Sequence, residues 1–503
     1  MPNYIDSSFN QSKFIPIVLS QQIMPGTFEH TISLLVEDFL DMSVFESRYK
    51  NDDTGRPAYD PAMLLRVILT AYSRGCTSSR RIQMLCEQNT VFMALSGDTQ
   101  PHFTTLARFI SQMSDVIQGM YTEVLLVCSQ EGLIGSNMFA IDGCKLPSNA
   151  SKEWSGTHAE LTKKHKKMSR AVRRMLKKHR EEDASGAVND DIQREAEDKN
   201  IATLRKSAKK VKQFCNTNVD RAGIKGKVVK SNITDNESAK MKTSHGTLQG
   251  YNGVAAVDDK HQIVVAAEAY GQGPENNLLI PMIAQVGENM GVDYIAATKV
   301  TADSGFHSKD NIKYCQDESI DAYIADGNYR KRDPRFKARD RYQPKARKAQ
   351  FFKAADFDYS ASNDACICPA GKAMWRQSTR QIDGNDYVTF SGFLKDCRSC
   401  PLLKQCMRKP IKSQGRQVSI KVNSGDNKLP SPVEKMKTKI DSSVGRHVYS
   451  RRLGTVEPVF GNINTAKGLS RFSLRGKEKV NAQWLMYCLV HNVEKIQRYG
   501  NIA

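Results

Sequence analysis

A long, strongly charged segment divides the apolar parts of this 503-residue chain and restricts its possible folds more than any other feature. Residues 163–180 carry ten Lys or Arg and no acid, whereas residues 181–198 carry eight acids and one Arg. This segment cannot supply a core, because only Val172, Met175 and Leu176 form a thin apolar stripe at helical spacing. It predicts a charged helical insertion over residues 150–245, which can fold as a hairpin that pairs basic and acidic arms.

Strand-like and helical segments alternate on both sides of this insertion. Residues 137–146 resemble a strand, and residues 251–257 and 262–269 flank a turn at Asp258, as in a hairpin. A helix is expected at 276–286, a strand at 295–301, a helix at 308–315 and a short strand at 322–325. Closing helices are expected at 455–463 and 481–496. This order predicts a mixed α/β fold in which helices cover a sheet.

The N-terminal part, residues 1–131, has a helical pattern instead. Asp60 and Pro61 make a good N-cap and first helical position, and apolar residues follow at helical spacing. Short helices with tight turns fit a helix-turn-helix DNA-binding unit, and they fit a plain helical bundle equally well.

The formal net charge of +20 indicates a polyanionic partner, because Lys and Arg that neutralise phosphates release condensed counterions. We find no signal peptide, no lipidation motif and no apolar run of about 18 residues, so nucleic acid is favoured over a membrane. Scattered cysteines fit a reducing compartment such as the cytoplasm. The basic residues we expect to contact DNA are Arg80, Arg81, Arg108, Lys163, Lys164, Arg173 and Arg174.

Three carboxylates stand where apolar elements would ordinarily have none. Asp142 interrupts the apolar strand at 138–141, and Asp303 follows the strand-like residues 296–301. Glu457 lies after Thr455, which can cap a helix that begins there. Taken singly, each acid also fits a turn or a first helical turn. Taken together, they are the ligand type that two Mg²⁺ ions need for phosphoryl transfer on DNA.

The motifs around these acids resemble those of the DDE transposases of bacterial insertion sequences. Residues 140–143 (AIDG), 302–306 (ADSGF) and 454–461 (GTVEPVFG) carry the resemblance, with 59–61 (YDP), 251–253 (YNG) and 472–476 (FSLRG) in matching order. The similarity is to the IS4/IS5-like group, most of all to its IS1182-like branch.

This resemblance implies an RNase H-like catalytic core over residues 132–329 and 445–503, interrupted by insertions. It implies that Asp142, Asp303 and Glu457 bind two Mg²⁺ or Mn²⁺ ions, cut DNA at the element's ends and join the freed 3′-hydroxyl to target DNA. A homodimer in the active complex and a place at the bacterial nucleoid are implied as well.

The same group carries a Tyr, Arg, Glu, Lys pattern around its last acid. Tyr449 and Arg452 match the first two positions, although four residues rather than three separate Arg452 from Glu457. Asn464 stands where the Lys is expected, and Lys467 is nearby but out of register. We therefore expect Tyr449, Arg452 and Lys467 to contact DNA.

Five cysteines cluster within residues 330–444, which we expect to form an inserted module. The spacing of these cysteines predicts a structural Zn²⁺ site. We choose Cys368, Cys397, Cys400 and Cys406 as its ligands, because the resemblance implies a Cys-Pro-x-Gly knuckle such as the one at Cys368. Cys366 could substitute for one ligand, and unrelated core cysteines are the alternative. The module begins with a basic run at 330–353 with interleaved aromatic residues, which fits a nucleic-acid contact or a disordered loop.

Two other functions remain compatible with the sequence. One is a domesticated DNA-binding regulator that has kept this fold and lost catalysis. The other is a nuclease that hydrolyses DNA without joining strands. Three intact acids argue against the regulator, whereas only an assay of strand joining separates the nuclease from the transposase.

Overall fold

The computed structural model describes residues 16–49, 57–185, 191–223, 226–243, 246–336, 339, 351–360, 363–382, 385–408, 413–422 and 430–502. The chain divides into two compact units. Unit 1 comprises Met1–Asp326 with Met436–Ala503, and unit 2 comprises Gly327–Lys435. In the described part of the chain, no helix is both long and apolar enough to cross a bilayer.

Unit 1 begins with a group of short helices. They are α1 (Phe28–Leu34), α2 (Pro61–Ser73), α3 (Ser79–Gln88), α4 (Thr90–Leu95), α5 (Phe103–Ser111) and α6 (Ile117–Gln130). The Asp60 side chain accepts a hydrogen bond from the Ala62 N–H at 2.9 Å, so it caps α2 as expected. The N-terminal helical pattern is therefore confirmed at the level of its helices.

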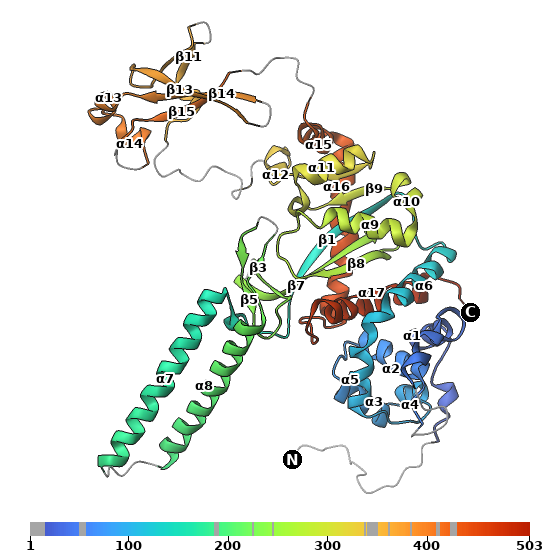
Figure 1. The fold of residues 1–503 in the computed structure, drawn as a ribbon. Helices are drawn as coiled ribbons and strands as arrows, with labels where there is room; N and C mark the ends of the chain where they lie inside the picture. The colour runs from blue at the N-terminus through green and yellow to red at the C-terminus, as the bar shows by residue number, and fades with distance from the viewer. Residues whose placement is uncertain are drawn as a thin grey trace, which may run out of the picture. The chain divides into compact units, whose positions relative to one another are not determined.

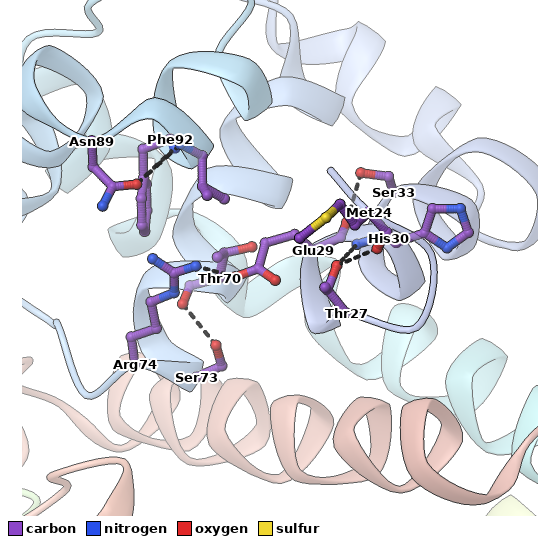
Figure 2. A network of polar contacts seen from close by, with 11 residues as sticks. Met24, Thr27, Glu29, His30, Ser33, Thr70, Ser73, Arg74, Asn89 and Phe92 are labelled. Atoms are coloured by element: carbon purple, nitrogen blue, oxygen red, sulfur yellow. Dashed lines mark hydrogen bonds and ion pairs between the residues drawn. The ribbon is translucent and has the colours of Figure 1, made fainter. Parts of the chain in front are cut away.

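A polar network ties three of these helices together (Figure 2). Glu29 of α1 is 8% exposed and forms an ion pair with Arg74, which directly follows α2. The Arg74 guanidinium lies 5.2 Å from the ring centroid of Phe92 in α4. Asn89 caps α4 by accepting the N–H groups of Val91 and Phe92. Because the Glu29 carboxylate is buried and paired, loss of Arg74 would leave it uncompensated.

A six-stranded mixed sheet forms the centre of unit 1 (Figure 1). Its strands are β1 (Met138–Pro147), β6 (Ala239–Thr243), β7 (Gly246–Asp258), β8 (Val264–Tyr270), β9 (Lys299–Ala302) and β10 (Ala322–Ile324). Their order is β10-β9-β1-β7-β6, with β8 also paired to β7. Strands β10, β9 and β1 run parallel, whereas β1–β7, β7–β8 and β6–β7 are antiparallel. The predicted mixed α/β fold is confirmed.

Helices cover this sheet and complete the hydrogen bonds of its edge. They are α9 (Leu279–Met290), α10 (Val292–Ala297), α11 (Lys309–Asp317), α15 (Pro432–Asp441), α16 (Ser443–Gly461) and α17 (Lys477–Tyr499). The side chain of Asn492 in α17 bonds both the N–H and the carbonyl of Val264, each at 2.9 Å. Asn289 of α9 donates to the Val265 carbonyl at 2.8 Å. Strand β8 therefore exposes fewer unpaired backbone groups than a free edge would.

The charged insertion contains two long helices that lie side by side, α7 (His158–Ser185) and α8 (Asp191–Thr217) (Figure 1). Leu161 and Val211 pack together in a small apolar cluster. Lys178 of α7 binds Glu197 of α8 at 2.9 Å. Short strand pairs accompany the helices: β2 (Ser155–Gly156) with β5 (Ser231–Asn232), and β3 (Arg221–Ala222) with β4 (Val228–Val229). The two helices thus pair as a hairpin, held together in part by ion pairs between their side chains.

Two sequence predictions in unit 1 were wrong in their boundaries. The helix expected to begin at Thr455 is α16, which begins at Ser443 after the cap Ser442. Thr455 does not cap, because its hydroxyl donates to the Arg451 carbonyl one turn earlier at 3.0 Å. The strand expected at 295–301 is shorter, because residues 292–297 form α10 and β9 begins only at Lys299.

Unit 2 is built on a five-stranded antiparallel sheet of order β11-β12-β13-β14-β15. Its elements are α12 (Tyr329–Arg332), β11 (Asp358–Ser360), β12 (Ala365–Ile367), β13 (Ala373–Ile382), β14 (Asn385–Gly392), α13 (Leu394–Arg398), α14 (Leu403–Cys406) and β15 (Gln417–Lys421). Phe357, Met374, Phe390 and Val418 belong to one buried cluster. Residues 337, 338 and 340–350 of the predicted basic run lie outside the described residues.

Candidate active site

The register of two parallel strands brings Asp142 and Asp303 together. Strands β1 and β9 pair from Met138 to Ile141, and Ile141 stands opposite Ala302. Asp142 directly follows Ile141, and Asp303 directly follows Ala302. Both aspartates therefore stand just after the last pair of residues that joins β1 to β9. Carboxyl ends of parallel strands are where α/β sheets commonly place their sites.

Arg452 of α16 reaches both carboxylates. One terminal nitrogen of its guanidinium forms an ion pair with Asp142 Oδ2, and the other lies 3.7 Å from Asp303 Oδ1. The Arg452 side chain is 7% exposed, whereas those of Asp142 and Asp303 are 19% and 39% exposed. The guanidinium lies 5.7 Å from the ring centroid of Tyr449, one turn earlier on α16. The two predicted acids and the predicted Tyr and Arg therefore share one site.

Burial and neighbouring charges perturb this site strongly. Burial raises the pKa of Asp142 above its ordinary value, and the Asp303 carboxylate adds to that shift. The Arg452 guanidinium and the Gly143 N–H, which donates to Asp142 Oδ1 at 2.8 Å, oppose it. Burial also raises the pKa of Tyr449 to about 12. An acid pair of this kind favours a bound cation that compensates its charge.

Glu457 is not gathered with the two aspartates. It follows Arg452 by five residues on α16, which turns it by roughly 140° around the helix axis, and it is exposed. Val456, which is 0% exposed, faces the interior beside it. Across the described residues, no three or more His, Cys, Asp or Glu side chains are arranged so that they could hold a metal ion. The chemistry of Asp142 and Asp303 fits a hard divalent cation, while the role of Glu457 stays a prediction.

Lys467 is buried rather than available to DNA. It is 1% exposed and binds Glu494 at 2.6 Å and Asn462 Oδ1 at 3.1 Å. Burial lowers its pKa, and the Glu494 carboxylate opposes that shift. The expected phosphate contact by Lys467 does not fit this arrangement, because the ammonium already serves a buried ion pair.

The other basic residues expected to contact DNA lie at or near the surface. Six of them are exposed and one, Lys164, is half-buried; the exposed residues are Arg80, Arg81, Arg108, Lys163, Arg173 and Arg174. Lys164 lies 4.2 Å from the Trp154 ring centroid, and Arg80 lies 4.9 Å from that of Phe103. Both cations are thereby partly ordered by aromatic side chains.

Four of the clustered cysteines line one cavity of unit 2. They are Cys368, Cys397, Cys400 and Cys406, the set chosen as zinc ligands from the sequence. Burial raises the pKa of Cys406, and the nearby Cys397, Cys400 and Cys368 raise it further. Cys366 does not line the cavity; it is 1% exposed in the adjoining core cluster and 3.9 Å from the Met374 sulfur. The cavity has suitable donors, although no group of three among the described residues is arranged as a formed metal site.

Comparison with known families identifies two segments of the chain. A family model described as "Transposase DDE domain" matches residues 367–497, which include α16 and α17. A second, described as "Transposase domain (DUF772)", matches residues 17–112, which include α1–α5. The two matches indicate an insertion-sequence DDE transposase. No curated protein matches the sequence significantly.

In this DDE transposase, the matched DDE segment contains Arg452 and Glu457, whereas Asp142 and Asp303 lie outside both matched segments. The sequence indicated Arg452 only as a phosphate contact. Its ion pair with Asp142 was missed because 310 residues separate the two. The one feature of the sequence that pointed to Arg452 as a site residue was its position one turn after Tyr449 in a family motif.

Proposed function

We propose that this transposase cleaves DNA at the ends of an insertion sequence and joins those ends to target DNA. The observation that carries the proposal is the position of Asp142 and Asp303 directly after the last residues that β1 and β9 pair, where Arg452 contacts both carboxylates. A central β1 with a parallel neighbour and an antiparallel neighbour supports an RNase H-like core. The sequence motifs further favour the IS1182-like branch.

The chemistry divides between the metal ions and the residues of this chain. Bound Mg²⁺ or Mn²⁺ would activate the attacking oxygen and stabilise the leaving oxygen. Asp142 and Asp303 would hold the ions, and Glu457 would complete the ligand set only if its carboxylate moved toward the two aspartates. Arg452 neutralises the acid pair and is placed to turn its guanidinium to a DNA phosphate once cations take over that role.

The test is a strand-joining assay with a DNA duplex that carries one element end and a free 3′-hydroxyl. We expect Mg²⁺- or Mn²⁺-dependent joining to a second duplex. Cleavage without joining would identify a nuclease, and DNA binding without either reaction would identify a regulator. A homodimer in the active complex would appear as one synaptic species that contains two DNA ends.

We further propose that the α7–α8 hairpin grips the DNA backbone. Residues 200–217 of α8 contain no acid, and the part of α7 that packs against them, residues 161–176, contains none either. The basic residues of these two segments are Lys163, Lys164, Lys166, Lys167, Arg170, Arg173, Arg174, Arg205, Lys206, Lys209, Lys210 and Lys212. Most of the acids lie in the other half, where they pair with Lys178 and Arg194.

Replacing Lys163, Lys164, Arg173 and Arg174 with Gln should weaken DNA binding without regard to sequence. The slope of log K against log salt should fall by about 0.9 for each phosphate that the variant no longer neutralises. Fluorescence anisotropy over a salt series measures both effects. Lys177→Gln with Lys199→Gln is the control, because these lysines already bind Glu181 and Glu195. An unchanged salt slope in the four-residue variant would exclude the hairpin from the DNA interface.

We also propose that Cys368, Cys397, Cys400 and Cys406 hold a structural zinc ion in unit 2. Purified protein should contain about one zinc per chain, and Cys400→Ser should lose most of it because three ligands bind Zn²⁺ more weakly than four. Chelation should disturb the folding of unit 2, or DNA binding, before it disturbs the Mg²⁺ chemistry. Cys215→Ser, in the other unit, is the control and should keep its zinc. Wild-type protein free of zinc by metal analysis would contradict this proposal.

A further inference from the structure

Glu275 lies in the connection between β8 and α9 and contacts two strands of the sheet. Its Oε1 is 3.1 Å from Lys145 Nζ on β1 and accepts a hydrogen bond from Asn252 Nδ2 on β7, also at 3.1 Å. Its side chain is 11% exposed. A carboxylate held this far from solvent is ordered by its partners, so Glu275 fixes the connection against β1 and β7.

The glycines that follow Asp142 and Asp303 pack against this Glu275–Asn252 pair. A Cβ at Gly305, two residues after Asp303, would overlap Glu275 Oε2. A Cβ at Gly143, next to Asp142, would lie 2.8 Å from Asn252 Oδ1. Both approaches are shorter than a Cβ ordinarily makes, so a side chain at either glycine would require the Glu275 or Asn252 side chain, or the backbone beside the aspartate, to shift.

A second contact joins the same connection to the turn that carries Asp303. Asn311 of α11 is 1% exposed, and its Nδ2 donates to the Asn276 carbonyl at 2.8 Å and to the Phe306 carbonyl at 2.7 Å. The backbone beside Glu275 is thereby tied to the backbone three residues after Asp303. These bonds are independent of the Glu275 carboxylate.

Asn252 supplies a further observation. It is 0% exposed, and its Oδ1 has no hydrogen-bond partner in the described part of the chain. Such a buried, unpaired acceptor destabilises the folded state. Its Nδ2 is committed to Glu275, which turns Oδ1 toward Gly143. The unpaired Asn252 oxygen is a local loss of stability at the point where Asn252 of β7 contacts β1 beside Asp142. Functional sites commonly contain such a local loss.

We infer that Glu275, with Asn252 and Asn311, forms a bracket that sets the separation of Asp142 and Asp303 for metal binding. This inference rests on the proposed function and adds to it. Glu275 acts on Asp303 through Gly305 and on Asp142 through Asn252 and Gly143, so it is a positioning residue. Supporting residues of this kind typically change metal affinity or activity by about 10–100-fold when they are lost.

The experiment combines Gly305→Ala, Glu275→Ala and the double variant in the full-length protein. Binding of Mn²⁺ is measured by electron paramagnetic resonance of the free ion, and DNA cleavage is measured over a Mn²⁺ series. Glu275→Ala should raise the Mn²⁺ Kd by about 10–100-fold and recover much of its cleavage at saturating Mn²⁺. Gly305→Ala should lose about 10²-fold in cleavage, because the new methyl group displaces the Asp303 turn.

The double variant decides the inference. Because the methyl group that Gly305→Ala introduces would meet the Glu275 carboxylate, removal of that carboxylate should restore cleavage to the level of Glu275→Ala alone. Glu275→Asp withdraws the carboxylate from Gly305 and serves in the double variant if Glu275→Ala folds poorly, whereas Glu275→Gln keeps the side-chain shape and should not restore cleavage to Gly305→Ala. Glu288→Ala, an exposed acid of α9, should behave as wild type. The bracket would be overturned if the double variant lost cleavage by the product of the two single losses. It would also be overturned if Glu275→Ala and Glu275→Gln bound Mn²⁺ with the wild-type Kd.

Failure of the bracket and failure of the proposed function give different results. If Asp303→Asn abolishes cleavage while the Glu275 variants bind Mn²⁺ normally, only the bracket is wrong. If Asp303→Asn cleaves like wild type, the proposed two-aspartate site itself is wrong.

Discussion

Asp303→Asn should reduce metal-dependent DNA cleavage by at least about 10³-fold while DNA binding is retained. The substitution keeps the size of the side chain and removes the charge that would hold a divalent cation beside Asp142. The carboxylate is 39% exposed at the end of β9, so the fold has little dependence on it. A gel assay of a labelled element end measures cleavage, and anisotropy measures binding.

Asp310→Asn is the matched control. Asp310 is an exposed acid on α11, seven residues after Asp303, and its loss should leave cleavage unchanged. Asp142→Asn should be as inactive as Asp303→Asn, because both acids are needed for the same ions. Cleavage by either variant within a few-fold of wild type would contradict the assignment of Asp142 and Asp303 as the catalytic pair.

Arg452→Ala should lower the free energy of unfolding at neutral pH by about 3 kcal/mol, because it leaves the buried Asp142 carboxylate without its partner. The pKa of Asp142 is already raised in the folded protein, so folding favours its protonated form. Protonated Asp142 therefore contributes stability that is fully present below the ordinary pKa of an Asp in the unfolded chain. That stability is lost as the pH rises through the raised pKa of Asp142 in the folded protein. Removal of Arg452 raises that pKa further, so the destabilisation should grow with pH.

Urea unfolding at several pH values measures this dependence, with the exposed Arg471→Ala as the control. Arg452→Lys should retain part of the stability, because it keeps the charge and loses the two-pronged geometry. Mn²⁺ should stabilise Arg452→Ala more than wild type, since a cation can then compensate both aspartates without displacing the guanidinium. A loss of stability that does not vary with pH, together with no added effect of Mn²⁺, would show that Arg452 matters for packing alone.

The sequence predicted the succession of strands along the chain because the apolar patterns at 137–146, 251–257 and 262–269 are local. Its errors arose where two local signals competed. Thr455 after Gly454 resembles a helix start, yet the Thr455 hydroxyl bonds back to Arg451 inside the longer helix α16. Residues 295–297 have strand-compatible side chains, yet they complete α10 before β9 begins.

The candidate site could be predicted from the sequence only in part. Motif resemblance singled out Asp142, Asp303, Glu457, Tyr449 and Arg452, and it singled out the four cysteines that line one cavity. It could not tell that Lys467 is committed to Glu494, because that pair forms between α17 and the turn after α16. Nor did it point to Glu275, whose neighbours Lys145, Asn252 and Gly305 are distant in sequence.

The sequence by itself determined the charged hairpin, the alternation of strands and helices, and the two aspartates beside apolar strand residues, because each follows from the chemistry of neighbouring residues. Only the tertiary structure decided which charges meet. It placed Arg452 between Asp142 and Asp303, left Glu457 exposed, and set Glu275 against Gly305. The physical reason is that electrostatic pairing and burial depend on distances in space, which strand register and helix rotation set across hundreds of residues.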